Sequence, residues 1–193
     1  MRPTAISLYM TGPSFFYFTD DKRGKNPVQM ALALPKDTGL VFRHYDHPER
    51  SSLARQIADI TRKRGLTLFV AKSAKLAAQV GAYGCHLPTH MMGRLPLLKY
   101  KYPTLHFSVA CHSVWDLCQT QNLGADMAYL SPLYPSRSHP TARALSPLAV
   151  ASQVRSLYLP VYGLGGINWN RWAQLQDLGF AGFGAIDLFE LDI

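Results

Sequence analysis

The chain has 193 residues, of which 48% are hydrophobic and 17% are charged, so it is neither a disordered segment nor a membrane-spanning protein. A chain of this length buries on the order of 70% of the surface that its unfolded form exposes. We therefore expect one domain over residues 1–193 that needs no disulfide or structural metal. Lys and Arg number 20 against 12 Asp and Glu, and the formal charge of +8 favours anionic partners such as phosphates or nucleic acid.

The cysteines and the first residues indicate the compartment. Cys85, Cys111 and Cys118 are odd in number, and their spacing matches neither a redox pair nor a zinc ribbon. The first ten residues hold no apolar run long enough for a signal peptide, and no run of ~18 apolar residues follows. We expect a soluble, cytoplasmic protein that does not enter a membrane.

Short apolar runs rich in aromatic and β-branched residues alternate with segments whose apolar residues are three or four apart, the pattern of βαβ units. The expected strands are Phe15–Thr19, Leu40–His44, Leu66–Ala71, Gly84–Leu87, Leu105–Cys111, Met127–Leu130, Val161–Leu164 and Gly182–Ile186.

Three of the intervening helices have clear ends. The first covers Ser51–Arg64 and stops at Gly65, and the second is capped by Ser113 and runs until Gly124. The third is capped by Asn168 and ends at Gly179. Weaker patterns predict helices over Pro27–Leu34, Ala74–Val80 and His90–Leu98.

Eight strands alternating with helices predict a (β/α)8 TIM barrel, with a doubly wound parallel sheet as the alternative. Such barrels usually have ~250 residues and seldom fewer than ~200, so we expect shortened loops and a missing helix. The segment between Leu130 and Leu145 is the candidate for that missing helix, because prolines 132, 135 and 140 oppose regular structure there.

Two glycine turns follow the last two expected strands. Gly165 and Gly166 lie between a strand and the helix capped by Asn168, where backbone amides can approach an anion. Gly184 and Ala185 end the eighth strand, and the loops after strands seven and eight are where TIM barrels bind phosphate. A tight turn alone would also explain the first pair. No GxGxxG follows the first strand, so we expect no nicotinamide cofactor.

His112 directly follows the fifth expected strand, a position from which an imidazole can transfer protons at the active-site rim of a barrel. An ordinary helix-start histidine bonded to its neighbours is the alternative.

We expect no metal site. Cys85 and His86 point to opposite faces of a strand, and no acidic pair follows a strand, because Asp126 precedes one and Asp187 has no identifiable partner.

A proline-rich loop after the sixth strand supplies further candidates for a phosphorylated ligand. Its Ser136, Ser138 and His139 carry hydroxyl and imidazole groups beside the guanidinium of Arg137. Arg43, at the end of the second strand, is another candidate anion ligand. An ordinary polar loop would have a similar composition.

Four segments together resemble the thiamine-phosphate synthase/TenI family. Gly124–His139 is similar to its motif GADYVGLGPVFPTxTK and Gly84–Pro88 to GVHLG, while Gly163–Ile167 is similar to AIGGI and Gly182–Ile186 to GVAVI. Order and spacing agree from about Phe15 to Phe189. The resemblance implies a (β/α)8 barrel and a ligand related to thiazole phosphate, with its phosphate at Gly165–Gly166 and Gly184–Ala185.

The chain departs from the family motifs where the synthase holds Mg²⁺. Ala71 and Lys72 replace the Asn and Asp of INDR, and Met91 replaces the metal-binding Asp of GQEDLP. The QLREK motif keeps only Arg43, and the lysine of TxTK is His139. A lone ammonium at Lys72 is a poor substitute for Mg²⁺ on a diphosphate leaving group.

The family's G-x-S-x-H motif keeps its histidine as His112, although Ser108 and Ala110 replace its Gly and Ser. TenI-type members lack the metal site and aromatise a thiazole phosphate carboxylate tautomer by proton transfer through a histidine. The resemblance therefore favours a thiazole tautomerase that needs no cofactor, with His112 as acid and base.

Two alternatives stay open. One is a divergent thiamine-phosphate synthase with residual, Mg²⁺-dependent activity, and the other is a non-catalytic protein that kept the phosphate pocket. The expected partner is a small phosphorylated heterocycle. Nucleic acid is not expected, because no basic-aromatic motif accompanies the +8 charge. The sequence leaves open whether the chain forms a homo-oligomer.

Overall fold

The computed structural model describes residues 12–21, 25–135 and 143–187, and these form a closed barrel of eight parallel strands. The strands follow one another around the barrel in chain order, and β1 pairs with β8 to close it. They are β1 (Phe15–Phe18), β2 (Gly39–Phe42), β3 (Thr67–Ala71), β4 (Gly84–Leu87), β5 (His106–Cys111), β6 (Met127–Leu130), β7 (Val161–Leu164) and β8 (Gly182–Ala185). The prediction of a TIM barrel is confirmed, and the doubly wound sheet is not formed.

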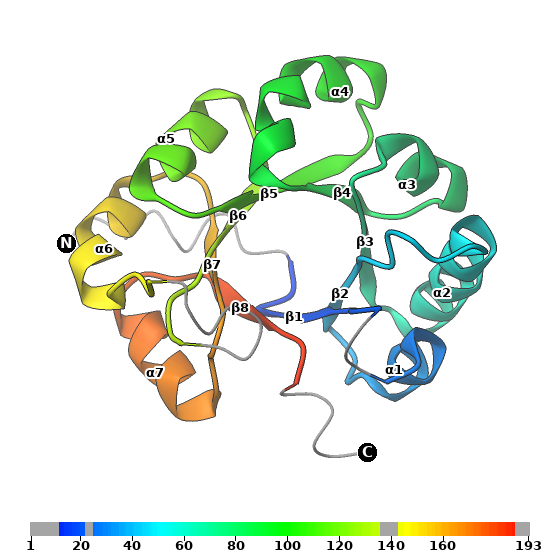
Figure 1. Ribbon diagram of the computed structural model, residues 1–193, viewed down its shortest axis with the longest axis horizontal. Helices are drawn as coiled ribbons and strands as arrows, with labels where there is room; N and C mark the ends of the chain where they lie inside the picture. Colours follow the sequence, from blue (N-terminus) through cyan, green and yellow to red (C-terminus); the bar gives the residue numbers. More distant parts are fainter. Residues whose placement is uncertain (1–11, 22–24, 136–142, 188–193) are drawn as a thin grey trace.

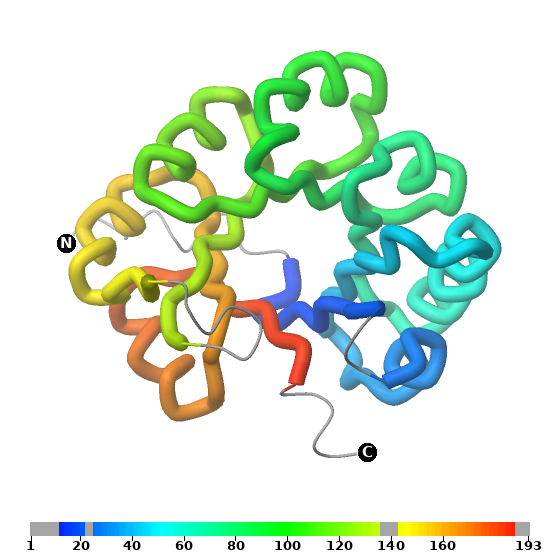
Figure 2. Tube along the Cα trace, in the orientation of Figure 1, coloured from blue at the N-terminus to red at the C-terminus, as the bar shows by residue number. Residues whose placement is uncertain are grey.

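Helices surround the barrel in chain order, two after β4 and one after each of the other first seven strands (Figures 1 and 2). Asn26 caps α1, because its side chain accepts from the amides of Val28 and Gln29. Pro27 is the first residue of the helix, where the missing amide hydrogen of a proline costs no helical hydrogen bond. The helices are α1 (Pro27–Ala33), α2 (Arg50–Arg64), α3 (Ala74–Val80), η2 (Thr89–Arg94, a 3₁₀ helix), α4 (Leu95–Lys101), α5 (Val114–Asn122), α6 (Pro147–Ser156) and α7 (Trp169–Asp177).

Two helix predictions need correction. The connection after β6 does not lack a helix, because α6 begins at Pro147, where the Ser146 hydroxyl accepts a bond from the amide of Ala149 at 3.4 Å. The helix expected over His90–Leu98 is instead η2 followed by α4. Pro96 in the first turn of α4 lacks an amide donor, which suits the start of a new helix rather than its middle.

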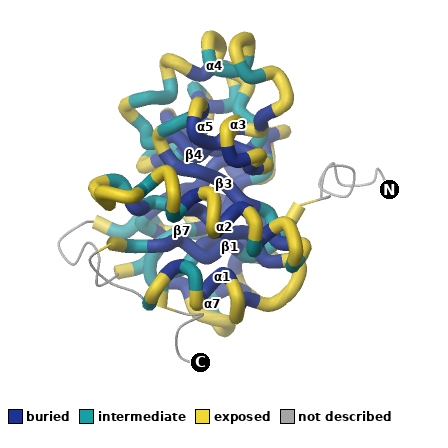
Figure 3. Tube along the Cα trace, turned by 90° about the vertical axis from the view of Figure 1, so that its right-hand side faces the viewer, coloured by how far each residue is buried: buried dark blue, intermediate teal, exposed yellow. Residues whose placement is uncertain are grey.

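The strands separate two buried clusters. One fills the space between the strands and the helices, and Figure 3 shows the buried residues concentrated there and on the strands, with exposed residues on the outer helix faces. The other, the barrel-interior cluster, lies inside the closed sheet. It consists of Phe16, Phe18, Val41, Phe69, Ala71, Met127, Tyr129, Tyr162 and Ala181.

Side chains along each strand point alternately into the barrel and out towards the helices. The positions that point inward therefore indicate which residue at the end of a strand also points inward. Val41 is in the barrel-interior cluster and Phe42 is in the outer one, so Arg43 follows on the inner side. Because all neighbouring strands are parallel, the carboxyl ends of all eight strands lie at one end of the barrel. No helix among the described residues has the length and apolarity that crossing a bilayer requires.

Candidate functional site

The candidate site is the carboxyl-terminal end of the barrel, which we call the mouth. In TIM barrels, this end carries the catalytic and ligand-binding groups, because loops and strand ends converge there. The mouth is formed by residues that directly follow the strands: Thr19–Asp21, Arg43–Tyr45, Lys72, Pro88, His112, Ser131, Gly165–Gly166 and Ile186–Asp187.

His112 lies in the mouth directly after β5, as predicted, and its side chain is anchored by one ring nitrogen. Nδ1 lies 3.0 Å from the carbonyl oxygen of Ser131 and 3.3 Å from the hydroxyl of the same residue. A carbonyl oxygen only accepts, so Nδ1 donates and the neutral ring keeps its lone pair on Nε2. The backbone amide of His112 donates to Asp116 at 2.8 Å, which ties the residue to the first turn of α5. An exposed imidazole with a free lone pair is equipped to accept a proton.

Beneath the mouth, a second histidine is buried inside the barrel. His86 Nδ1 lies 2.9 Å from the hydroxyl of Ser108, and its ring packs edge-on against Phe18 and Tyr129. Burial lowers the pKa of His86 to about 3, and the positive charge of Arg43 adds to this. His86 is therefore neutral at pH 7 and forms part of the floor of the mouth.

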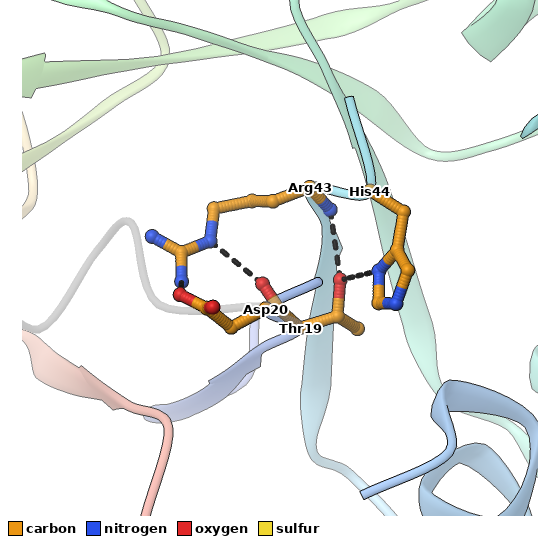
Figure 4. A network of polar contacts seen from close by, with 4 residues as sticks. All are labelled: Thr19, Asp20, Arg43 and His44. Atoms are coloured by element: carbon orange, nitrogen blue, oxygen red, sulfur yellow. Dashed lines mark hydrogen bonds and ion pairs between the residues drawn. The ribbon is translucent and has the colours of Figure 1, made fainter. Parts of the chain in front are cut away.

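A polar network joins the ends of β1 and β2 (Figure 4). Arg43 Nη2 is paired with the Asp20 carboxylate at 2.9 Å, and Arg43 Nε donates to the carbonyl oxygen of Thr19 at 2.8 Å. The Thr19 hydroxyl accepts from the amide of Arg43 and lies 3.0 Å from His44 Nδ1, so its own proton is available to that nitrogen. Burial lowers the pKa of His44, and the Asp21 carboxylate opposes this effect only in part. Arg43 is in the mouth as predicted, but its guanidinium already has an acidic partner.

Asp20 and Asp21 correct the expectation that no acidic pair follows a strand. Both come directly after Thr19, which was predicted as the last residue of the first strand, so the sequence contained the signal. Asp20 is paired with Arg43, and Asp21 accepts from the amide of Asp46 at 3.5 Å.

The two glycine turns lie side by side, because Leu164 of β7 pairs with Gly184 of β8. Gly165 and Gly166 both have left-handed backbone angles, with φ of +91° and +63°. A Cβ atom at Gly166 would lie 2.4 Å from the carbonyl oxygen of Pro135, and one at Gly184 would lie 2.4 Å from the ring of Phe18. The glycines therefore serve the packing of their turns as well as any ligand. Within the described part of the chain, the amides of Gly165 and Gly166 donate no hydrogen bond, which leaves them available to an anion.

Arg171 is a residue of this region that the sequence analysis missed. It lies in the first turn of α7, donates to the carbonyl oxygen of Gly166 and places its guanidinium 4.4 Å from the centroid of the Tyr134 ring. Its position three residues after the capping Asn168 was the available signal. The predicted ligand residues Ser136, Ser138 and His139 lie outside the described residues.

The donor set at the family's metal positions does not fit Mg²⁺. Ala71 offers only a carbonyl oxygen, and that oxygen accepts from Arg50 at 2.7 Å, while Lys72 adds a positive charge. Met91 lies in η2 and carries a thioether, whereas Mg²⁺ prefers carboxylate and water oxygens. Over the described ranges, no group of three His, Cys, Asp or Glu side chains converges as a metal site.

A cavity of about 440 Å³ opens at the opposite, amino-terminal end of the barrel. Aromatic rings line it, including Tyr83 and His106, which stack with their centroids 4.1 Å apart. Asp126 at its edge precedes β6 as expected, and it is paired with Lys99 at 2.9 Å and accepts from the amide of Phe107. Both the ion pair and the hydrogen bond of this carboxylate are therefore structural.

The chain is thus a (β/α)8-barrel protein with an exposed imidazole and a glycine turn at the carboxyl ends of its strands. A family model described as thiamine monophosphate synthase matches residues 18–188. The chain therefore belongs to the thiamine monophosphate synthase family, a family of thiamine biosynthesis.

Individual relatives agree with this assignment. A protein of Aquifex aeolicus, provisionally named thiamine-phosphate synthase 2, is 28% identical over 182 residues, which cover 92% of this chain and 97% of that protein. The thiamine-phosphate synthase of Thioalkalivibrio sulfidiphilus is 31% identical over 136 residues, 69% of this chain and 64% of that protein. The solved thiamine phosphate pyrophosphorylase of Pyrococcus furiosus shares the fold, with a TM-score of 0.78, 22% identity, and coverage of 90% of this chain and 85% of that one.

Proposed function

We propose that this protein is a TenI-like thiazole tautomerase, which binds a phosphorylated thiazole in the mouth and moves a proton on its ring through His112. The observation that carries the proposal is the His112 imidazole, held by Nδ1 on the carbonyl oxygen of Ser131 with its Nε2 lone pair free. Tautomerisation needs a group that removes a proton from one ring atom and returns it to another, and a neutral imidazole does both.

The mouth supports the ligand assignment on its β7–β8 side. The amides of Gly165 and Gly166, which donate no hydrogen bond to any described residue, lie just before the N-terminus of α7, where the helix dipole favours a phosphate, and Arg171 contacts Gly166. The altered metal positions favour proton transfer over diphosphate displacement, because they supply no carboxylate to hold Mg²⁺. No cofactor is needed for the proposed reaction.

Replacing His112 with Ala tests the proposal. We expect turnover of the thiazole phosphate carboxylate tautomer to fall about 10²- to 10⁴-fold, with the binding of thiazole phosphate unchanged. His106→Ala is the matched control, since His106 is exposed at the other end of the same strand and is expected to keep full activity. Unchanged turnover in His112→Ala removes the assignment of this residue.

The second candidate is a divergent thiamine-phosphate synthase, which the names of the relatives favour. A thermal-shift titration separates the candidates, using thiazole phosphate, thiazole phosphate carboxylate and the pyrimidine diphosphate, each with and without Mg²⁺. A ligand at 100 times its dissociation constant stabilises the folded state by roughly 2.7 kcal/mol, which such a titration detects. Stabilisation by the thiazole compounds without metal supports the tautomerase, and stabilisation by the diphosphate only with Mg²⁺ supports the synthase. No shift with any of them indicates a non-catalytic protein with a changed pocket.

A further inference from the structure

Lys72 has an uncommon backbone conformation at the mouth. It directly follows β3 and has a φ of +64°, in the left-handed region that costs a non-glycine residue roughly 1–2 kcal/mol. Its amide donates to the carbonyl oxygen of His86 at 2.8 Å, so the strained residue is fixed to the end of β4. Backbone strain of this kind collects at ligand-binding and catalytic positions.

The side chain of Lys72 is held over the mouth by an aromatic ring. Its Nζ lies 4.0 Å from the centroid of Tyr45, and that ring packs in turn against the barrel-interior cluster. A cation–π contact fixes the ammonium while leaving its N–H donors free for a ligand. Within the described ranges, Lys72 forms no ion pair with a carboxylate.

The other cations on this side of the mouth already have partners. Arg43 is paired with Asp20, and Arg50 donates to the carbonyl oxygens of His44 and Ala71, each at 2.7 Å. Among these three cations, and counting only partners in the described ranges, Lys72 is the one whose N–H donors form no hydrogen bond or ion pair. One ammonium matches one carboxylate, whereas a diphosphate would require more positive charge or a metal ion.

We propose that Lys72 is the specificity residue that binds a carboxylate on the heterocycle whose phosphate lies at the β7–β8 turns. In the closed barrel β3 and β7 lie on opposite sides, so the end of β3, which Lys72 follows, lies across the mouth from the Gly165–Gly166 turn. The two anionic groups of one ligand would then be bound at opposite sides of the ring on which His112 acts. This inference rests on the proposed function, and it adds the residue that recognises the carboxylate of the proposed substrate.

The test compares two ligands, thiazole phosphate and thiazole phosphate carboxylate, by calorimetric titration of three proteins. Lys72→Asn removes the charge, and asparagine tolerates the left-handed conformation, so the variant keeps the fold. Lys75→Asn is the matched control, because Lys75 is an exposed lysine of α3 and its replacement changes the net charge equally. We expect the unaltered protein and Lys75→Asn to bind the carboxylate compound at least about 10-fold tighter than thiazole phosphate.

In Lys72→Asn we expect this preference to fall to about one, through weaker binding of the carboxylate compound alone. A preference that persists in Lys72→Asn overturns the inference, as does an equal loss for both ligands, which would mark a structural role. In both of these outcomes the proposed function stands, because thiazole phosphate still binds to the unaltered protein. If the unaltered protein binds neither compound, the proposed function fails and the inference fails with it.

Discussion

Replacing Gly166 with Ala introduces two separate costs that the structure lets us estimate. The first is conformational, because φ is +63° and a side chain in the left-handed region costs roughly 1–2 kcal/mol. The second is steric. The new Cβ would lie 2.4 Å from the carbonyl oxygen of Pro135 and 2.9 Å from Cβ of Tyr134, and ordinary contact begins near 3.4 Å, so the loop has to move by about 1 Å. Overpacking of this kind costs about 1–3 kcal/mol, which gives a loss of about 2–5 kcal/mol in the free energy of unfolding.

Urea denaturation of three glycine variants separates the two costs. Gly124→Ala carries the conformational cost alone, because φ is +81° and no atom lies within 4 Å of the new Cβ. Gly93→Ala carries neither, since it has open space and no left-handed backbone. We expect losses of about 2–5 kcal/mol for Gly166→Ala, about 1–2 kcal/mol for Gly124→Ala, and no loss for Gly93→Ala. In thermal unfolding, each kcal/mol corresponds to about 2–4 °C for a chain of this size.

Equal midpoints for Gly166→Ala and Gly124→Ala would refute the reasoning. Such a result would show that the Gly166 turn does not press against the loop at Pro135. A titration with inorganic phosphate adds a functional measurement on the same proteins. Because the loop shift moves the Gly166 amide, we expect weaker phosphate binding in Gly166→Ala and unchanged binding in Gly124→Ala.

Two further predictions concern the charges near the mouth. Burial lowers the pKa of His86 from an unfolded value near 6.5 to about 3. Between these two pH values the unfolded chain binds one proton more than the folded chain. The free energy of unfolding therefore falls as the pH drops from 6.5 towards 3. At about 1.4 kcal/mol per pH unit, urea denaturation should show a loss of about 2 kcal/mol between pH 6.5 and 5, and His86→Gln should abolish this part of the pH dependence. Arg43→Met breaks the half-buried pair with Asp20 and should cost about 1–3 kcal/mol, whereas Arg62→Met, which breaks the exposed pair with Asp59, should cost less than about 1 kcal/mol. Equal denaturation midpoints for the two arginine variants would contradict the stabilising role of the Arg43 network.

The alternation of apolar runs and helical spacing predicted eight parallel strands and favoured the barrel, whereas the pairing of β1 with β8, which excludes the doubly wound sheet, is visible only in the structure. Buried strands of a parallel sheet are short continuous apolar runs, so their bounds agree with the structure to within two residues. Helix α6 was not predicted, because prolines 132, 135 and 140 oppose regular structure between β6 and Leu145, and the helix begins only after them, at Pro147. The pair Ser146–Pro147 is itself a helix-start signal, a capping hydroxyl followed by a proline in the first turn.

The position of each site residue along its strand was predictable, but its partner was not. His112 and the glycine turns could be placed from the ends of single strands. The pairing of Arg43 with Asp20 and the contact of Lys72 with Tyr45 depend on the register between neighbouring strands, which a sequence pattern does not specify. The same holds for Gly184, whose missing side chain leaves room for Phe18 of the neighbouring strand β1.

The three histidines at and below the mouth differ in how freely they can exchange a proton. His44 and His86 are buried, burial lowers the pKa of each, and Nδ1 of each is engaged with a hydroxyl, so both stay neutral at pH 7. Protonating His86 would place an uncompensated charge in a low-dielectric interior, which is costly, and at His44 nearby carboxylates offset the cost of burial only in part. His112 is exposed, and its Nδ1 bond to Ser131 orients the ring without occupying Nε2. Of the three, His112 is therefore the one suited to the proton transfer that we propose, while His44 and His86 stay neutral and support the surrounding walls.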